Sequence, residues 1–400
     1  MPAESTIRPS AFLRNFLRSE ALSGILLLAA AVAAIALANS PLKDAYAHAT
    51  HLPLRFGDGS WRVDTTLLHA TNDGLMAVFF LVVGLEIKRE FLTGELAGKG
   101  AAILPVAAAC GGAAVPAAIY AAFNAGTPAA HGWGIPMATD IAFAVGVLAL
   151  LGRHVAPVFK VFLTAVAVVD DLIAVLVIAF FYTSGLNLGA LAVVAGACAV
   201  LYAFNRAGVQ SLAPYLLVGA VLWAAMARSG VHATIAGVLL GMSVPATGAQ
   251  TSPLRRLEHA LHPWVAWGIM PVFALANAGV TVPAGQVGAM LTSPIALGIV
   301  VGLFFGKQVG IFGTTFLLAR LGVGTVPADA RGRRSLWGVA LLGGIGFTMS
   351  LFVSGLAFHG EAMTDVSKAA ILAGSLMSGL AGAAVLASVP EPVAGDADAG

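Results

Sequence analysis

Apolar stretches alternate with short polar loops along most of the chain, and a helix needs about 20 apolar residues to cross a bilayer. The pattern predicts twelve transmembrane helices, over residues 21–39, 70–87, 101–123, 133–152, 157–182, 188–205, 212–227, 230–245, 263–281, 295–319, 336–358 and 367–388. Spans seven and eight are short, and little besides Arg228 separates them. The first apolar region, of about 18 residues, is longer than that of a cleaved signal peptide, so we expect it to remain as a span.

These spans predict an all-α membrane protein with a single polytopic domain. We expect a cytoplasmic N-terminal segment over residues 1–19, the transmembrane domain over 20–388, and a disordered acidic tail over 389–400. The loop 40–69, on the predicted outer face, contains the sequence LRFGDGSWRV. Its short apolar-leaning runs around Gly-Asp-Gly-Ser indicate a small hairpin, and an unstructured loop is the alternative.

Composition and charge support the membrane class. Of the residues, 59% are hydrophobic and 10% are charged, whereas soluble domains carry about 25% charged residues. Basic residues concentrate in alternate loops, for example at Arg331, Arg333 and Arg334, so by the positive-inside rule both termini are cytoplasmic. Basic clusters are not interleaved with aromatic residues, and we expect no nucleic-acid partner. Cys110 and Cys198 lie in apolar stretches and indicate neither a disulfide framework nor a metal site.

Four ionisable residues lie in the middle of predicted spans: Asp140, Asp170, Asp171 and Lys307. Each charge at that depth costs roughly 3 kcal/mol on insertion scales. A buried structural salt bridge is one explanation, but three carboxylates here compete for one lysine. Since ionisable groups inside a membrane usually serve ion or proton pathways, we expect a functional site.

Two spans are also interrupted. Pro136 breaks span four, and Gly343, Gly344 and Gly346 weaken span eleven. Span four is second in the triple 3–5 and span eleven is second in the triple 10–12, and they cross the membrane in opposite directions. This predicts an inverted repeat whose two discontinuous helices meet at a central site. An ordinary proline kink and glycines that permit close helix packing are the alternative.

The chemistry of these residues suits exchange of a cation for a proton. Removal from water disfavours the charged form of each aspartate, and Lys307 is the obvious counter-ion. A small hard cation prefers carboxylate and carbonyl oxygens, and a carboxylate that binds it can bind a proton instead. If only the loaded states can reorient across the membrane, this competition is already ion/proton exchange.

Several long motifs resemble one family in order along the chain. They are TNDGLMAVFFLVVGLEIKRE, GIPMATDIAF, VDDL, GVHATIAGV, RLEHALHPWV, FALANAGV, FGKQVGIF and GGIGFTMSLF. Over about residues 10–388 the chain resembles an NhaA-type sodium/proton antiporter. The resemblance implies a transporter without a cofactor, and not an enzyme, in the bacterial inner membrane. It also implies a homodimer joined through the loop hairpin, and electrogenic exchange that is active at alkaline pH and serves sodium and pH homeostasis.

The resemblance also assigns roles to residues. Asp171 is the main carboxylate for sodium (or lithium) and for the proton, and Asp170 pairs with Lys307 and takes part in proton exchange. Asp140, beside Thr139, faces the two broken helices and balances their dipoles. A pH-sensing set is implied as well: Glu86, Arg89, Glu90, His232, Arg255, Glu258 and His259. Residue type alone favours ordinary interfacial charges for the inner-face members of this set, and a hydrogen-bonded interior histidine for His232.

Three positions depart from the family pattern: Ile173, Arg255 and Gln308 stand where Gly, Lys and Pro are familiar. Arg255 puts the pH threshold in question, because Arg and Lys are not interchangeable at paired sites. Two other functions stay open. An intramembrane aspartyl protease could use Asp140 with Asp171, and a cation channel would conduct without coupling to protons.

Overall fold

The computed structural model describes residues 11–56, 63–98, 100, 102–183, 185–247, 252–281, 285, 287–324 and 329–390. All twelve predicted spans fall on helical segments. In order they are α1 (Ala11–Ala38), α3–η2–α4 (Leu67–Ala70, Thr71–Leu75, Met76–Thr93), α5 (Ile103–Asn124), η3–α6 (Pro128–Met137, Ile141–Leu151), α7 (Pro157–Phe181), α8 (Leu188–Arg206), α9 (Leu212–Met226), α10 (Ile235–Ser243), α11–η5–α12 (Pro253–Trp264, Val265–Ile269, Met270–Asn277), α14–η6–α15 (Pro294–Val301, Gly302–Gly306, Lys307–Arg320), α16–α17 (Ala330–Leu342, Phe347–Ala357) and α18 (Glu361–Ala387).

Eight helices of the described part are long and apolar enough to cross a membrane. The other predicted spans are short or differently built. Span eight was predicted from residue 230, but its helix α10 begins only at Ile235, because residues 227–234 form turns. In spans two, nine and ten, single π-helical turns (η2, η5 and η6) interrupt the α-helix.

The hairpin predicted in the loop 40–69 is confirmed. Strand β1 (Pro53–Phe56) pairs antiparallel with β2 (Val63–Thr66), and Leu54 lies opposite Thr65. The Gly-Asp-Gly-Ser turn itself lies outside the described residues, as do residues 1–10 and most of the predicted tail. The short helix α2 (Lys43–Thr50) precedes the hairpin, and the Tyr46 hydroxyl donates to the Leu275 carbonyl at 2.7 Å. This contact ties the loop to α12.

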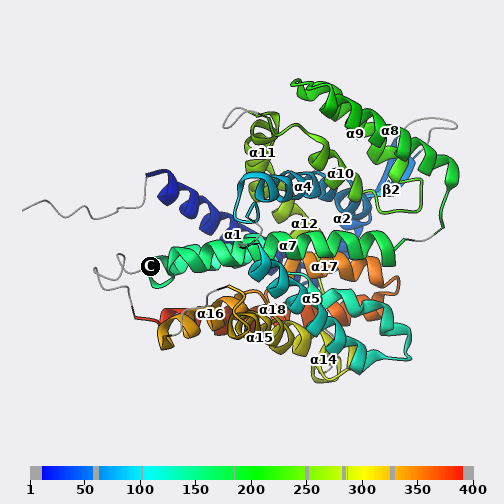
Figure 1. Cartoon of the computed structure of the whole chain (residues 1–400). Helices are drawn as coiled ribbons and strands as arrows, with labels where there is room; N and C mark the ends of the chain where they lie inside the picture. The colour runs from blue at the N-terminus through cyan, green and yellow to red at the C-terminus, as the bar shows by residue number, and fades with distance from the viewer. Residues whose placement is uncertain are drawn as a thin grey trace, which may run out of the picture.

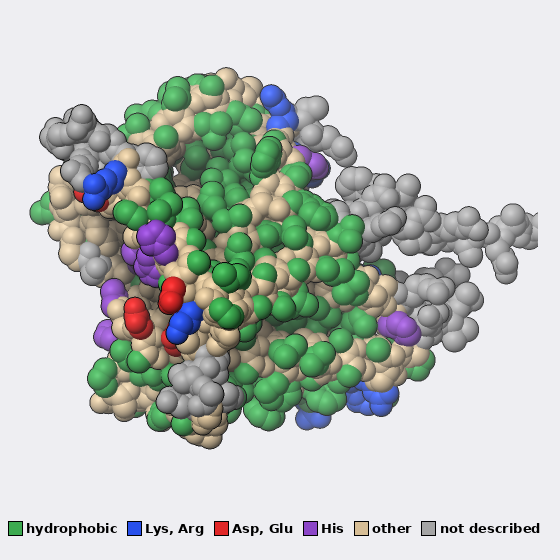
Figure 2. Space-filling model, turned by 180° about the vertical axis from the view of Figure 1, so that it is seen from behind, with side chains coloured by type: hydrophobic (Ala, Val, Ile, Leu, Met, Phe, Trp, Pro, Cys, Tyr) green, Lys and Arg blue, Asp and Glu red, His purple; other side chains and the backbone are tan. Residues whose placement is uncertain are grey.

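Helix α7 runs through the middle of the molecule, between two groups of helices (Figure 1). On one side α4 packs on α10 and α1 packs on α6 and α12; on the other, α5 packs on α14 and α15, and α16 and α14 pack on α18. Helix α1 begins and α18 ends on the same side of the molecule, as an even number of spans requires. Hydrophobic side chains cover the middle of the face in Figure 2, with charged side chains and histidines towards its margins. This distribution fits a protein surrounded by lipid.

Candidate functional site

The fourth span is discontinuous at the predicted place. The 3₁₀ helix η3 ends at Met137, residues 138–140 are extended, and α6 begins at Ile141. Pro136 contributes to the break because it lacks an amide hydrogen, so it cannot donate to the helical ladder. The peptide groups around Thr139 are therefore available for partners outside their own helix.

The eleventh span is interrupted over residues 343–346, between α16 and α17. Glycine allows these two breaks to approach each other closely. A Cβ atom on Gly346 would lie 3.0 Å from the carbonyl oxygen of Ala138, which is shorter than ordinary van der Waals contact. We call the place where residues 138–140 meet residues 343–346 the crossing.

Hydrogen bonds join the two extended segments at the crossing. The Thr139 hydroxyl donates to the Gly343 carbonyl at 2.8 Å, and the Asp140 amide donates to the Ile345 carbonyl at 2.7 Å. Both side chains are 1% exposed. Backbone groups freed by the two breaks thus satisfy one another, which is a requirement for irregular backbone inside a membrane.

The Asp140 carboxylate accepts hydrogen bonds from the first turns of two helices. Its Oδ1 accepts from the Phe143 amide of α6 at 3.0 Å, and its Oδ2 accepts from the Thr348 amide of α17 at 3.1 Å. The Thr348 hydroxyl donates to the same Oδ2. Helix starts carry partial positive charge, so one carboxylate stabilises both. Asp140 is also close enough to the Asp170–Asp171 pair to act on Asp171 electrostatically.

The ion pair beside the crossing joins α7 to α15. Lys307 Nζ lies 2.5 Å from Asp170 Oδ2, and both side chains are 1% exposed. Lys307 is the first residue after the π-helical turn η6. Asp171 follows Asp170 in the unbroken helix α7 and is 2% exposed. Its Oδ1 is buried and has no hydrogen-bond partner among the described residues, and the same holds for Asp170 Oδ1.

The structure therefore brings together Asp170 and Lys307, and it places Asp171 next to them with acceptor capacity unused. Carboxylate oxygens of this kind can take a proton or a hard monovalent cation. Among the described residues, no group of three or more His, Cys, Asp or Glu side chains is arranged to hold a metal ion.

Part of the predicted pH-sensing set forms a second cluster at one end of α4. Arg89 Nη1 lies 2.7 Å from Glu90 Oε1, and Arg89 Nε lies 3.0 Å from Glu258 Oε1 on α11. Burial lowers the pKa of the Arg89 guanidinium, but the Glu258 and Glu90 carboxylates raise it by more, so its pKa lies above the ordinary value. Glu258 Oε2 is buried without a hydrogen-bond partner among the described residues. Glu86 lies one helical turn away on α4.

The observed contacts of other members of the predicted pH-sensing set are made with residues outside this cluster. The exposed His259 ring contacts the backbone carbonyl of Arg255 at 2.9 Å. His232 Nε2 lies 3.1 Å from the Tyr182 carbonyl, before the start of α10. Lys88, next to Arg89, donates to backbone carbonyls at the other end of α10. His232 and the Arg89 cluster therefore lie at opposite ends of that helix.

Sequence reasoning missed several contributors. Thr348 donates twice to Asp140, although its partner is 208 residues away in the chain. Asn72, in the π-helical turn η2, exchanges two side-chain hydrogen bonds with Asn277 at 2.8 and 3.2 Å. The sequence did contain a signal for the Asn72–Asn277 pair, because each of two predicted spans carries a side-chain amide. A threonine in an apolar span offered no such signal.

Two broken helices that cross beside a buried acid–base set define an ion-coupled secondary transporter. The sequence also matches the profile of the family described as Na+/H+ antiporter 1, over residues 14–386. The chain belongs to this family of Na+/H+ antiporters, which are transporters and not enzymes.

Three similar proteins are each named Na(+)/H(+) antiporter NhaA. The Caulobacter vibrioides protein is 52% identical over 95% of this chain and 91% of its own length. The Bordetella parapertussis protein is 51% identical over 98% of this chain and 99% of its own length. The Paramagnetospirillum magneticum protein is 52% identical over 95% of this chain and 97% of its own length. This level of identity over nearly whole chains confirms the predicted family and its all-α membrane fold.

Proposed function

We propose that this chain exchanges sodium, or lithium, for protons across the bacterial cytoplasmic membrane, and that it thereby controls internal sodium and pH. The observation that carries the proposal is the buried Asp171 carboxylate, which has an unpartnered oxygen and lies next to the Asp170–Lys307 ion pair. Na+, Li+ and H+ are cargo in this scheme, and no cofactor takes part.

Charge balance at the site explains coupling. Ionised Asp170 and Asp171 with protonated Lys307 carry one net negative charge, which is costly inside a membrane. A proton on Asp171 neutralises the set, and a bound sodium ion offsets one of its negative charges. Since both occupants use the same oxygens, they compete, and the unloaded site is the state that reorients least readily.

The Asp170–Lys307 pair accounts for an electrogenic cycle. When sodium is held by both carboxylates, Lys307 loses its ionic partner, and burial then favours its neutral form. One proton leaves from Asp171, and the other leaves from the coupled Asp170–Lys307 pair. Two protons then move in one direction for each sodium ion in the other. The net movement of one positive charge lets the membrane potential drive transport.

The crossing supplies the remaining parts of the proposed site. Freed carbonyls near Thr139 and Gly343–Gly346 are within the same buried region and can add neutral oxygen ligands as the backbone rearranges. Asp140 holds the helix starts of α6 and α17 in place. We assign ion coordination to Asp171 and Asp170, and the balancing of helix charge to Asp140.

We assign pH activation to the charged cluster around Arg89, Glu90 and Glu258. Arg89 supplies the positive charge of the cluster, and its carboxylate partners are Glu90 on the same helix and Glu258 on α11. The Arg89–Glu258 ion pair links the end of α4 to α11, and a change in the charge of the cluster would change the strength of this link. Arg255, His259, Glu86 and His232 complete the proposed set.

The proposed setting is a homodimer in the lipid bilayer with both termini in the cytoplasm. The charge bias of the loops supports this orientation, and so does the position of the start of α1 and the end of α18 on the same side of the molecule. Among the described residues the sheet consists of β1 and β2 alone, so each strand has one edge without a strand partner. Isolated hairpins are marginally stable, so a second copy is a suitable partner for these edges.

Proteoliposomes with an imposed sodium gradient test the proposal. Wild-type protein is expected to change the internal pH when sodium is added, and a potential clamped by potassium and an ionophore is expected to change the rate. Asp171→Asn keeps the shape of the side chain but removes its charge, so it is expected to abolish the sodium-driven pH change.

The matched control is Asp44→Asn, which alters an exposed aspartate of α2. It is expected to leave transport unchanged. Normal sodium-driven pH change in Asp171→Asn would show that another group binds the ion.

A further inference from the structure

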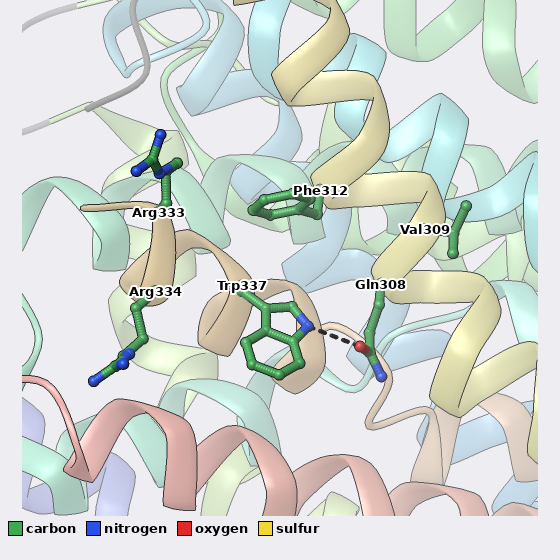
Figure 3. A pocket seen from close by; sticks show the side chains of 6 residues that line it. All are labelled: Gln308, Val309, Phe312, Arg333, Arg334 and Trp337. Carbon is green, nitrogen blue, oxygen red and sulfur yellow. Dashed lines mark hydrogen bonds between the residues drawn. The ribbon is translucent and has the colours of Figure 1, made fainter. Parts of the chain in front are cut away.

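A pocket outside the ion site lies between α15 and α16. Its volume is about 410 Å³, and it is lined by Gln308, Val309, Phe312, Arg333, Arg334 and Trp337. The two arginines lie at one end, Gln308 and Val309 at the other, and Phe312 and Trp337 between them (Figure 3). The pocket is therefore polar at one end and mostly apolar along its length.

The depth of the pocket follows from the helix geometry. Helices α16 and α17 have 13 and 11 residues on either side of the break, so the break lies near the middle of the membrane. Arg333 precedes Gly343 by ten residues, or about 15 Å along a helix. Half of the hydrocarbon core is also about 15 Å thick. The arginines thus reach the level of the lipid headgroups, and the apolar end of the pocket reaches the level of the acyl chains.

The charged end of the pocket has no ion-pair partner among the residues that the structure describes. Within the described residues neither Arg333 nor Arg334 forms an ion pair, and both are exposed. Arg320, at the same end of α15, places its guanidinium 4.6 Å from the centre of the Phe316 ring. Between Lys307 and Gly360 the sequence has one acidic residue, Asp329, and its carboxylate accepts from the Gly332 amide. This end of the pocket is electropositive.

The apolar side of the pocket is open to the surroundings. Val309 is 61% exposed and Trp337 is 45% exposed, which leaves both side chains available to an acyl chain. The Trp337 indole donates to Gln308 Oε1 at 2.9 Å, so the pocket has a fixed wall at its inner end. Gln308 directly follows Lys307 in α15.

We propose that this pocket binds one anionic phospholipid, with its phosphate on Arg333 and Arg334 and an acyl chain along Phe312, Trp337 and Val309. Guanidinium groups suit phosphate because they donate parallel hydrogen bonds as well as carrying charge. A soluble phosphate has no part that would occupy the apolar side. Positive charge at headgroup depth above an apolar groove is the pattern expected for an anionic lipid.

Titration of the purified full-length protein in neutral detergent tests the proposal. The probe is dioleoyl phosphatidylglycerol, and the readouts are the thermal unfolding temperature and the number of lipids bound in native mass spectra. The lipid is expected to raise the unfolding temperature of the wild type. In Arg333→Gln/Arg334→Gln the half-saturating lipid concentration is expected to rise about tenfold or more, since each basic residue contributes to attraction of anionic lipid.

The matched control is Lys43→Gln/Arg256→Gln, which also removes two exposed positive charges but lies outside the pocket. It is expected to respond to the lipid as the wild type does. Val309→Ser, which alters only the apolar side, is expected to weaken binding of phosphatidylglycerol. An equal response of the Arg333/Arg334 variant and the wild type would overturn the proposal. So would an equal shift from inorganic phosphate or from phosphatidylcholine.

Discussion

At the scale of single residues, substitutions in the Lys307–Asp170 ion pair can distinguish its contribution to stability from its contribution to transport. The two groups are buried 2.5 Å apart. Removal of one member of a buried pair leaves the other charge uncompensated, which typically costs 3–5 kcal/mol, whereas removal of both can be nearly neutral. The pair is therefore tested best by substituting its members singly and together.

Lys307→Ala is expected to lower the free energy of unfolding by about 3–5 kcal/mol, because Asp170 would remain buried without its partner. Thermal unfolding of the purified protein in detergent measures the loss. The second substitution Asp170→Asn is expected to restore most of the stability without restoring transport. Lys160→Ala is the matched control, since Lys160 is only partly buried and donates to one backbone carbonyl. Unchanged stability of Lys307→Ala would remove the proposed partnership.

The charged residues could be found from sequence, and their detailed contacts could not. A charge in an apolar span stands out because of its cost, so Asp140, Asp170, Asp171 and Lys307 were evident. Their pairing depends on how α7 and α15 approach each other in space, which spacing along the chain does not reveal. Thr348 illustrates the limit, because a hydroxyl in an apolar span costs little and attracts no notice.

At the scale of helices, glycine sets how closely α15 approaches α5. A Cβ atom on Gly310 would lie 2.8 Å from the Cα atom of Gly112. Lys307 lies one turn earlier on the same helix. A displacement of α15 at Gly310 would therefore move the ammonium group away from Asp170, even though no charged residue had been altered.

Gly310→Ala is accordingly expected to destabilise the protein by about 1–3 kcal/mol through overpacking, and to reduce sodium/proton exchange in proteoliposomes. Gly313→Ala is the matched control on the same helix, because nothing lies within 4 Å of its added Cβ atom. It is expected to be neutral or slightly stabilising. Equal behaviour of the two variants would show that close packing on α5 does not position Lys307.

The helices themselves were predictable to different degrees. Length and hydropathy located all twelve spans, and Pro136 with the glycines of span eleven indicated both breaks. The π-helical turns η2, η5 and η6 were missed, because one wider turn leaves the apolar pattern almost unchanged. Helix α10 was predicted too long, because the apolar residues before Ile235 form turns and do not extend the helix.

At the scale of the whole molecule, the proposed function makes sodium and protons compete for one site. If Asp171 binds either sodium or a proton, acidification should weaken apparent sodium binding. When one proton competes, the apparent KM for sodium is expected to rise up to about tenfold for each unit of pH below the competing range. Initial rates in proteoliposomes across pH, at several sodium concentrations, give this slope. A KM for sodium that is indifferent to pH would rule out the shared site.

The double contact of Asp140 constrains how the two repeats can move. One carboxylate accepts from the first turns of both α6 and α17, which belong to opposite halves of the chain. A motion that pulled these turns apart would have to provide the Thr348 amide and hydroxyl with new acceptors in the same step, far from bulk water. A rigid-body displacement that keeps the hydrogen bonds of the crossing intact avoids this loss. Alternating exposure to the two sides is then easier when both half-helices travel together past α7 than when either swings alone.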